Sequence, residues 1–298
     1  MKRLSLAAMV LAMAASTGGA QTLNQLMPSE RDSGFALLFD GTRIDPAVWK
    51  KWNGNLHGTA VGPQWSAQSG ALEKRGQGAN LMIDSFYTYF VFKMEFKVYS
   101  DNPAGNREGN SGVFYRTLIG SAAPQACGVE YQIRDILQAT PQASGSLYGG
   151  IAPSPYPWKS GDWNSMEIQA LPDSTVRHVL NGRTVVTYKF GTDAYFNALS
   201  GSGYSQGKYR DPETNREYLY GRNPSGYIAI QDYGDDMHLF VRNLKVARLP
   251  RAPTGTKLKS RRTADMPADP GRVHDIYLPF SPRIDGRLLE TDSRILFR

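Results

Sequence analysis

One short segment carries polar side chains whose spacing suits chemistry on a β-strand. Residues 128–135 read Gly-Val-Glu-Tyr-Gln-Ile-Arg-Asp. Successive side chains of a strand point to opposite faces of a sheet. The apolar face would hold Val129, Tyr131 and Ile133, and the polar face Glu130, Gln132 and Arg134. A solvated outer strand would show the same alternation, so the neighbouring segment has to decide between a site and an ordinary surface.

The preceding segment favours a site. Residues 110–116 read Asn-Ser-Gly-Val-Phe-Tyr-Arg, and consecutive strands usually pair, which would bring Arg116 close to the carboxylate row. Carboxylate, amide and guanidinium groups suit sugars, whose hydroxyls form paired hydrogen bonds while their C–H faces stack on aromatic rings. Packing is the commoner role of any one aromatic residue. The stacking candidates, in or beside the segment 141–162, are Tyr148, Trp158 and Trp163.

A second polar cluster follows an apolar run. Residues 231–236 read Gln-Asp-Tyr-Gly-Asp-Asp. Clustered carboxylates at a strand end can bind a divalent cation such as Ca²⁺ or Mg²⁺, although they are about as often a solvated turn. Asp232 is the candidate metal ligand, whereas Asn110, Gln231 and Tyr233 are candidates for binding substrate. The histidines have no metal-ligand spacing, which argues against zinc.

Other catalytic classes lack their motifs. The sequence has no Gly-x-Ser-x-Gly elbow, no glycine-rich phosphate loop and no Cys-x-x-Cys pair, so serine esterase, nucleotide-binding and thiol-redox functions have no support. Cys127 is the single cysteine, which excludes an intrachain disulfide. We expect it to be a small buried apolar residue.

The first 20 residues predict export. Lys2 and Arg3 precede an apolar run and small residues that end at Ala20, which is the pattern of a cleaved signal peptide. No cysteine stands at the cleavage point and no later run reaches the roughly 20 apolar residues of a spanning helix, so we expect no membrane anchor. The predicted location is periplasmic or secreted. The formal charge of +7 is not gathered into a basic stripe, and nucleic acid is not an expected partner.

The elements that must position these side chains are short strands. From residue 35 to 246, β-branched and aromatic runs alternate with Gly, Pro, Asn and Asp, which predicts an all-β sandwich or barrel. No convincing helical period appears between the strands. The predicted strands are 36–39, 64–68, 71–74, 89–99, 111–116, 128–135, 164–171, 175–180, 183–188, 227–231 and 239–248.

The connections complete the predicted organisation. Asn181-Gly182 predicts a tight type I′ hairpin, because both central residues of that turn need positive φ. Residues 141–162 and 191–224 are predicted to be long surface loops. The domain boundaries that we predict are a signal peptide at 1–20, an N-terminal linker at 21–33, one domain at 34–248 and a basic, proline-rich C-terminal tail at 249–298.

Taken in order, the motifs resemble the 3-keto-disaccharide hydrolase-like domain family over about residues 34–248. Each motif is short, and their order and spacing carry the resemblance. In two respects the chain departs from the family: Tyr233 stands where members often have His, and the first long loop is rich in proline. The matching motifs are Gly34-Phe35, Leu38-Phe39-Asp40-Gly41, Asn110-Ser111-Gly112 with Arg116, Glu130 to Asp135, Gly145-Ser146-Leu147-Tyr148, Trp163-Asn164, Leu180-Asn181-Gly182, Gln231-Asp232 and Phe240-Val241-Arg242-Asn243.

The resemblance implies a concanavalin A-like jelly roll of two antiparallel sheets that cleaves glycosides already oxidised at C3. A keto group at C3 acidifies the C2 proton, so a base can remove it and the C1 substituent leaves by elimination; hydration then completes a net hydrolysis. This chemistry needs a base, a stabiliser of the enolate oxygen and an acid. The predicted roles are Glu130 or Asp135 as base, Arg116 and Gln132 as oxygen stabilisers, and Asp232 as a metal or hydroxyl ligand.

Three alternatives remain open from the sequence. A two-carboxylate glycosidase would use two carboxylates about 5 to 10 Å apart, but Gln132 and Arg134 follow Glu130 on the polar face. A carbohydrate-binding module without catalysis fits the stacking aromatics and a Ca²⁺ site equally well. An inactive interaction domain would use the basic tail as its contact.

Overall fold

The computed structural model describes residues 22–52, 60–101, 108–118, 123–210, 215, 217–234 and 236–251. The predicted signal peptide and nearly all of the predicted tail lie outside the described residues. Within the described part of the chain, no helix is long and apolar enough to cross a membrane.

The described elements are almost all strands. Three short helical segments are present, namely α2 (Pro28–Asp32), the 3₁₀ turn η2 (Pro124–Ala126) and α3 (Asp193–Leu199). The strands are β1 (Phe35–Leu37), β2 (Trp49–Lys51), β3 (Trp65–Gln68), β4 (Ala71–Lys74), β5 (Leu81–Ile83), β6 (Phe90–Ser100), β7 (Asn110–Thr117), β8 (Val129–Arg134), β9 (Asn164–Ala170), β10 (Thr175–Leu180), β11 (Arg183–Lys189), β12 (Lys208–Arg210), β13 (Glu217–Leu219), β14 (Tyr227–Ile230) and β15 (Met237–Arg248).

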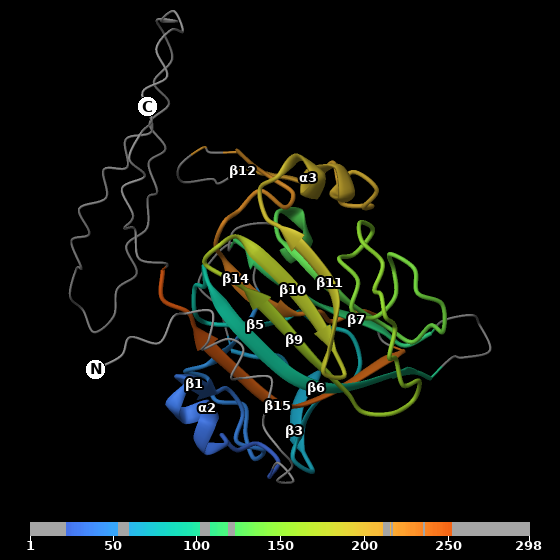
Figure 1. Ribbon diagram of the computed structural model, residues 1–298. Helices are drawn as coiled ribbons and strands as arrows, with labels where there is room; N and C mark the ends of the chain where they lie inside the picture. Colours follow the sequence, from blue (N-terminus) through green and yellow to red (C-terminus); the bar gives the residue numbers. More distant parts are fainter. Residues whose placement is uncertain are drawn as a thin grey trace, which may run out of the picture. The chain divides into compact units, whose positions relative to one another are not determined.

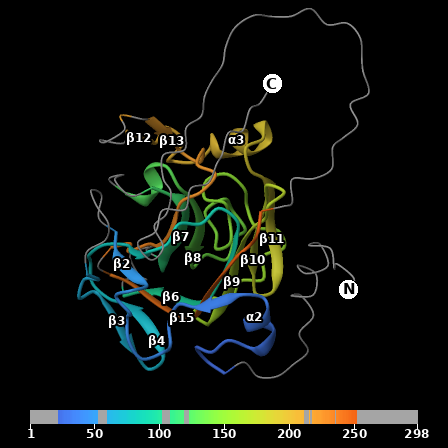
Figure 2. The ribbon, with the colours of Figure 1, turned by 90° about the vertical axis from the view of Figure 1, so that its left-hand side faces the viewer.

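Two antiparallel sheets form a sandwich, which confirms the predicted all-β jelly roll (Figure 1). The eight-stranded sheet has the order β11-β10-β9-β6-β15-β4-β3, and β1 also pairs with β15. The five-stranded sheet has the order β2-β5-β14-β7-β8. Figure 2 shows α2 at one end of the sandwich and α3, β12 and β13 at the other.

Each predicted strand is present, with its ends shifted by at most two residues. The strands that the prediction missed, β2, β5, β12 and β13, have three residues each, too few to show a period of two. The segment 191–224 is not a plain loop, because it contains α3, β12 and β13. Helix α3 begins where the Thr192 hydroxyl accepts a hydrogen bond from the Tyr195 amide at 3.3 Å.

The core lies between the two sheets and follows the alternation of the strands. Val129, Tyr131 and Ile133 of β8 are buried in it, as predicted. Cys127 is also buried. The hairpin between β10 and β11 has φ of +48° at Asn181 and +74° at Gly182, as the predicted turn requires.

A buried polar network crosses the core between the sheets. Nδ1 of His178 on β10 lies 3.0 Å from the carbonyl oxygen of Gly145, and its Nε2 lies 2.7 Å from the hydroxyl of Tyr115 on β7. The Tyr115 hydroxyl is in turn 2.7 Å from that of Tyr188 on β11. These partners suit a neutral imidazole that donates from Nδ1 and accepts at Nε2. Burial lowers the pKa of His178 to about 4.

This histidine predicts an acid-sensitive fold. The unfolded chain takes up a proton on His178 below its ordinary pKa of about 6.5, whereas the folded chain resists until about pH 4. Stability is therefore present above pH 6.5 and is lost as the pH falls toward 4, by an amount on the order of 3 kcal/mol. Urea unfolding between pH 7 and 4 should show a shallower pH dependence for His178→Gln than for the wild type; equal slopes would contradict the assignment.

Candidate active site

A pocket opens on the face of the five-stranded sheet that points away from the core. Its volume is about 180 Å³. Strands β7 and β8 supply its floor, and residues beyond β14 and from two connections surround it. The lining residues are Asn110, Glu130, Gln132, Arg134, Tyr148, Tyr204, Gln231 and Tyr233.

The polar face of β8 forms part of the floor of this pocket. Glu130, Gln132 and Arg134 all line it, so the alternation that could have marked a solvated surface marks a cavity. Glu130 is 2% exposed and Gln132 is 3% exposed. The third side chain, Arg134, is partly exposed and binds Glu108 at 3.0 Å and Gln142 at 2.8 Å.

The segment 143–148 extends the sheet along the free edge of β8. The amide of Gly145 donates to the carbonyl of Gln132 at 2.9 Å, and the amide of Tyr148 donates to the carbonyl of Glu130 at 3.1 Å. The Ser144 hydroxyl fixes the same edge by bonding both the amide and the carbonyl of Arg134 at 2.8 and 2.9 Å. This pairing places the Tyr148 ring in the pocket beside Glu130.

Glu130 is a buried carboxyl group with an unusual environment. Burial raises its pKa well above the ordinary range, and no opposing hydrogen bond or cation acts on it among the described residues. Gly112 of β7 provides the space, because a Cβ atom there would overlap the Glu130 carboxylate. Two nearby hydroxyls also have raised pKa values, those of Tyr148 and Tyr204. The larger cause is burial, and the second is the negative charge of Glu130.

The residues after β14 alternate in the same way. Gln231 and Tyr233 line the pocket, whereas Asp232 between them points elsewhere. The Gln231 amide donates to the carbonyl of Gly112 at 2.8 Å, and the Ser111 hydroxyl donates to the carbonyl of Gln231 at 2.9 Å. These bonds continue the pairing with β7 past the end of β14 and fix Gln231 beside the floor of the pocket.

Asp232 binds a lysine rather than facing the pocket. Its Oδ1 lies 2.9 Å from Nζ of Lys74, and both side chains are 1% exposed. Burial raises the pKa of Asp232, and Lys74 opposes that shift. Because the ammonium group stands where a cation would bind, this carboxylate does not fit a metal ion in the described arrangement. Among the described residues no group of three or more His, Cys, Asp or Glu side chains is arranged to hold one.

Arg116 and Asp135, which the sequence suggested for the site, do not line the pocket. The register of β7 and β14 shifts next to Arg116, whose φ is +56°. At this bulge the buried guanidinium lies 4.1 Å from the ring centroid of Phe190. Asp135 accepts a hydrogen bond from the indole of Trp158 at 2.9 Å, which ties it to the segment 141–162.

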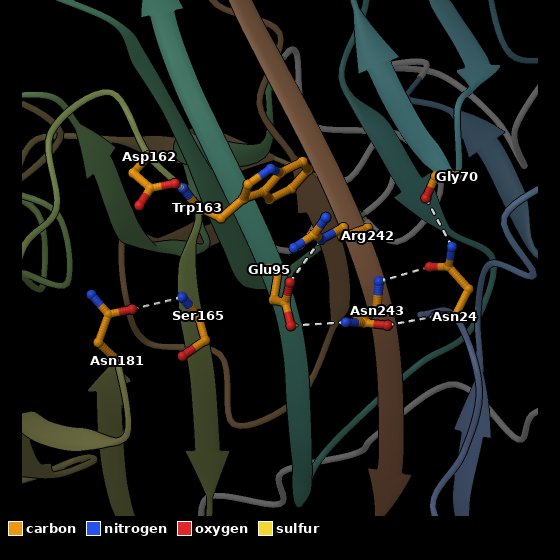
Figure 3. A network of polar contacts seen from close by, with 9 residues as sticks. All are labelled: Asn24, Gly70, Glu95, Asp162, Trp163, Ser165, Asn181, Arg242 and Asn243. Atoms are coloured by element: carbon orange, nitrogen blue, oxygen red, sulfur yellow. Dashed lines mark hydrogen bonds and ion pairs between the residues drawn. The ribbon is translucent and has the colours of Figure 1, made fainter. Parts of the chain in front are cut away.

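Trp163 also lies outside the pocket, next to the eight-stranded sheet (Figure 3). The Arg242 guanidinium lies 3.8 Å from its ring centroid and donates to Glu95 at 2.7 Å. Asn243 bonds the other Glu95 oxygen at 2.8 Å and exchanges two hydrogen bonds with Asn24. The tryptophan and the Arg242-Asn243 motif therefore stabilise the outside of the scaffold and hold the segment before α2.

Two pocket residues were not among the predicted site residues. Arg134 shares the polar face of β8, so the alternation itself could have included it. Tyr204 lies between α3 and β12 in an irregular stretch rich in Gly, Ser and Tyr, and no sequence pattern singles it out. Its ring centroid is 5.1 Å from that of Tyr148, so both rings contribute to the same pocket wall.

The fold and the pocket define a jelly-roll protein with a polar pocket on the outer face of one sheet, and comparison with known sequences gives its class. The family model described as "3-keto-alpha-glucoside-1,2-lyase-like domain" matches residues 34–247. The chain belongs to this family of carbohydrate-active hydrolases.

Individual relatives support the same assignment. A 3-keto-disaccharide hydrolase of Bacteroides thetaiotaomicron is 26% identical over 248 residues, which cover 74% of this chain and 80% of the relative. A crystal structure from Parabacteroides distasonis, named "putative glycosyl hydrolase", superposes with a TM-score of 0.63 at 24% identity and covers 77% of this chain and 100% of its own. The latter comparison concerns the fold alone.

The unpaired carboxyl group predicts that Glu130→Gln stabilises the folded protein in a pH-dependent way. Below the pKa of about 4.3 that Glu130 has in the unfolded chain, the group is protonated in both states and does not change the free energy of unfolding. As the pH rises above that value, the raised pKa of the folded state lowers the free energy of unfolding by a growing amount. The variant should match the wild type near pH 4 and melt at a higher temperature near pH 8. Each kcal/mol recovered raises the melting temperature of a domain of this size by about 2 to 4 °C. A variant that is less stable than the wild type at pH 8 would contradict the unpaired state.

Proposed function

We propose that the protein is an exported enzyme that cleaves 3-keto-glycosides by elimination and hydration, with Glu130 as the base. The observation that carries the proposal is the buried, unpaired carboxyl group of Glu130 at the floor of a polar pocket. The name of the Bacteroides relative and the family description support the choice of a 3-keto-glycoside as substrate.

The reaction needs a base that is stronger than an ordinary carboxylate. Glu130 removes the C2 proton, and the electron pair of the C–H bond passes into an enolate whose charge rests on the C3 oxygen. The enolate then expels the C1 substituent with the electron pair of the C–O bond, and the departing oxygen takes up a proton. Water adds across the resulting C1=C2 bond, which restores hydrogen at C2 and places a hydroxyl at C1. Burial that raises the pKa of Glu130 strengthens it as a base.

The rest of the pocket offers hydrogen-bond donors for the developing charge. The hydroxyls of Tyr148 and Tyr204 stay protonated because burial and Glu130 raise their pKa values, so they can donate to the enolate or to the leaving oxygen. The amide of Gln132 lies between Glu130 and Arg134 on the same face and can donate as well. Asn110, Gln231 and Tyr233 are left to bind the sugar hydroxyls and the ring face.

This arrangement favours elimination over two of the three rival functions, the two-carboxylate glycosidase and the binding module. A two-carboxylate glycosidase needs a second carboxyl group in the pocket, and Glu130 is the only carboxyl group among the described lining residues. A binding module could bind sugar hydroxyls through a paired, ordinary carboxylate, whereas a buried unpaired carboxyl group with a raised pKa destabilises the fold and suits a general base.

A divalent cation in the pocket stays a prediction. Asp232 does not fit it, but the lining oxygens of Glu130, Asn110, Gln132 and Gln231 are of the type that Ca²⁺ and Mg²⁺ prefer. Bound there, a cation would polarise the keto oxygen of the substrate. The periplasmic or secreted location also stays a prediction, and it rests on residues 1–20.

Turnover of a 3-keto-glucoside beside its unoxidised parent tests the proposal. The chain from residue 21 should release the aglycone from the keto compound alone, and Glu130→Gln should reduce the rate by roughly 10²- to 10⁴-fold, the usual contribution of a general base. Glu167→Gln is the matched control, because this carboxyl group belongs to the eight-stranded sheet and pairs with Lys93 at 3.6 Å. Adding chelator to the same assay tests the cation.

The route of cleavage can be read from the product. In deuterated water, elimination and hydration place deuterium at C2, whereas direct hydrolysis leaves hydrogen there. Equal release from both substrates, or full activity of Glu130→Gln, would overturn the proposal. Binding of the sugar without any turnover would favour the binding module.

A further inference from the structure

We infer that Lys74 is a positioning residue for the pocket: its ammonium group acts as a built-in cation that holds residues 231–234 and thereby places Gln231 and Tyr233. This inference concerns how the site is built and can be tested without the reaction. Its kinetic consequence rests on the proposed function.

The ammonium group of Lys74 is surrounded by oxygens from around the connection between β14 and β15. It pairs with Oδ1 of Asp232 at 2.9 Å and donates to the carbonyl of Met237 at 3.0 Å. It also donates to the carbonyl of Gly234. One carboxylate and two carbonyls are the ligands that a bound metal ion would use at such a turn. Here a side chain supplies the positive charge.

Lys74 reaches this position from the other sheet. It stands at the end of β4, and Leu72, two residues before it, points into the core. Strand β4 belongs to the eight-stranded sheet, whereas residues 231–234 continue from β14 of the five-stranded sheet. The lysine therefore links the scaffold sheet to the sheet that carries the pocket.

Residues 231–234 direct alternate side chains toward Lys74 and toward the pocket. The side chain of Asp232 points to Lys74. Because successive side chains of an extended segment point to opposite sides, the neighbours Gln231 and Tyr233 point into the pocket. The Asp232 amide is fixed separately by the side chain of Asn80 at 2.8 Å. Tyr233 is 42% exposed and has little packing of its own, so its position depends on the backbone on either side of it.

The ion pair is a poor source of stability. The free energy needed to desolvate two charges offsets most of their attraction. Replacing both partners by uncharged groups is therefore often neutral or stabilising, whereas removing one partner destabilises the fold by about 3 to 5 kcal/mol. A buried pair that contributes little stability yet gathers three separate oxygens is better explained by the geometry it imposes on residues 231–234.

A second buried pair in the same protein provides a matched control. Nζ of Lys245 on β15 lies 2.6 Å from Oε2 of Glu30 on α2, with side chains 1% and 7% exposed. This pair joins α2 to the outside of the eight-stranded sheet, and neither residue lines the pocket. Lys74→Met/Asp232→Asn and Lys245→Met/Glu30→Gln therefore remove the same chemistry from two places.

The experiment compares the two double variants in hydrogen exchange and in kinetics. In Lys74→Met/Asp232→Asn, the amides of Gln231 and Asp232 should lose protection, and KM for the 3-keto-glucoside should rise roughly tenfold with kcat changed less, because binding contacts are lost. Lys245→Met/Glu30→Gln should keep wild-type exchange in residues 231–234 and wild-type KM. Asp232→Asn alone, which keeps the ammonium group and its carbonyl bonds, should give a smaller change in the same direction and serves as the test if the double variant does not fold.

Wild-type exchange and KM in the Lys74→Met/Asp232→Asn variant, or equal losses in both double variants, would overturn the inference. If the wild-type protein cleaves no 3-keto-glucoside, the proposed function fails. The exchange of residues 231–234 still decides the role of Lys74 in that case.

Discussion

The buried carboxyl group of Glu130 is the constraint on which the pocket depends. A buried carboxyl group without a cation or hydrogen bond among the described residues disfavours its own charged form, because burial removes part of its hydration. Gly112 leaves room for it in β7, and the segment 143–148 covers the edge of its strand. Both features would serve any side chain of this size, but a buried carboxyl group with no compensating partner among the described residues is unusual, which is why we interpret the group as functional.

Much of this arrangement could be predicted from the sequence because it is local. A strand has a fixed period of two, so the side chains of β8 sort into a core face and a polar face whatever surrounds them. The Asn-Gly hairpin and the long strands follow from similarly short-range preferences. The same period explains why Gln231 and Tyr233, two positions apart, both reach the pocket.

The predicted site residues that lie outside the pocket, and the lining residue Tyr204 that no sequence pattern indicates, depend on contacts between distant parts of the chain. Asp232 belongs to a carboxylate cluster by sequence, but its partner Lys74 lies 158 positions earlier. Arg116 would share the side of β7 predicted for it if the strand were regular, and a bulge redirects it toward Phe190. Trp163 is a residue type on which sugars often stack, but the Arg242 guanidinium lies against its ring. Tyr204 lies in an irregular stretch of local turns, in which its amide donates to the Ser202 hydroxyl at 3.2 Å.

The two sheets differ in how their charged side chains are paired. On the eight-stranded sheet, Lys245 is paired with Glu30 and Arg242 with Glu95. On the five-stranded sheet, Glu130 has no cation or hydrogen-bond partner among the described residues. Lys74 joins the two, because its backbone belongs to the first sheet and its charge serves the second. Glu130 gives the pocket no ion pair that could fix its wall, and the pair of Lys74 with Asp232 supplies one from the neighbouring sheet.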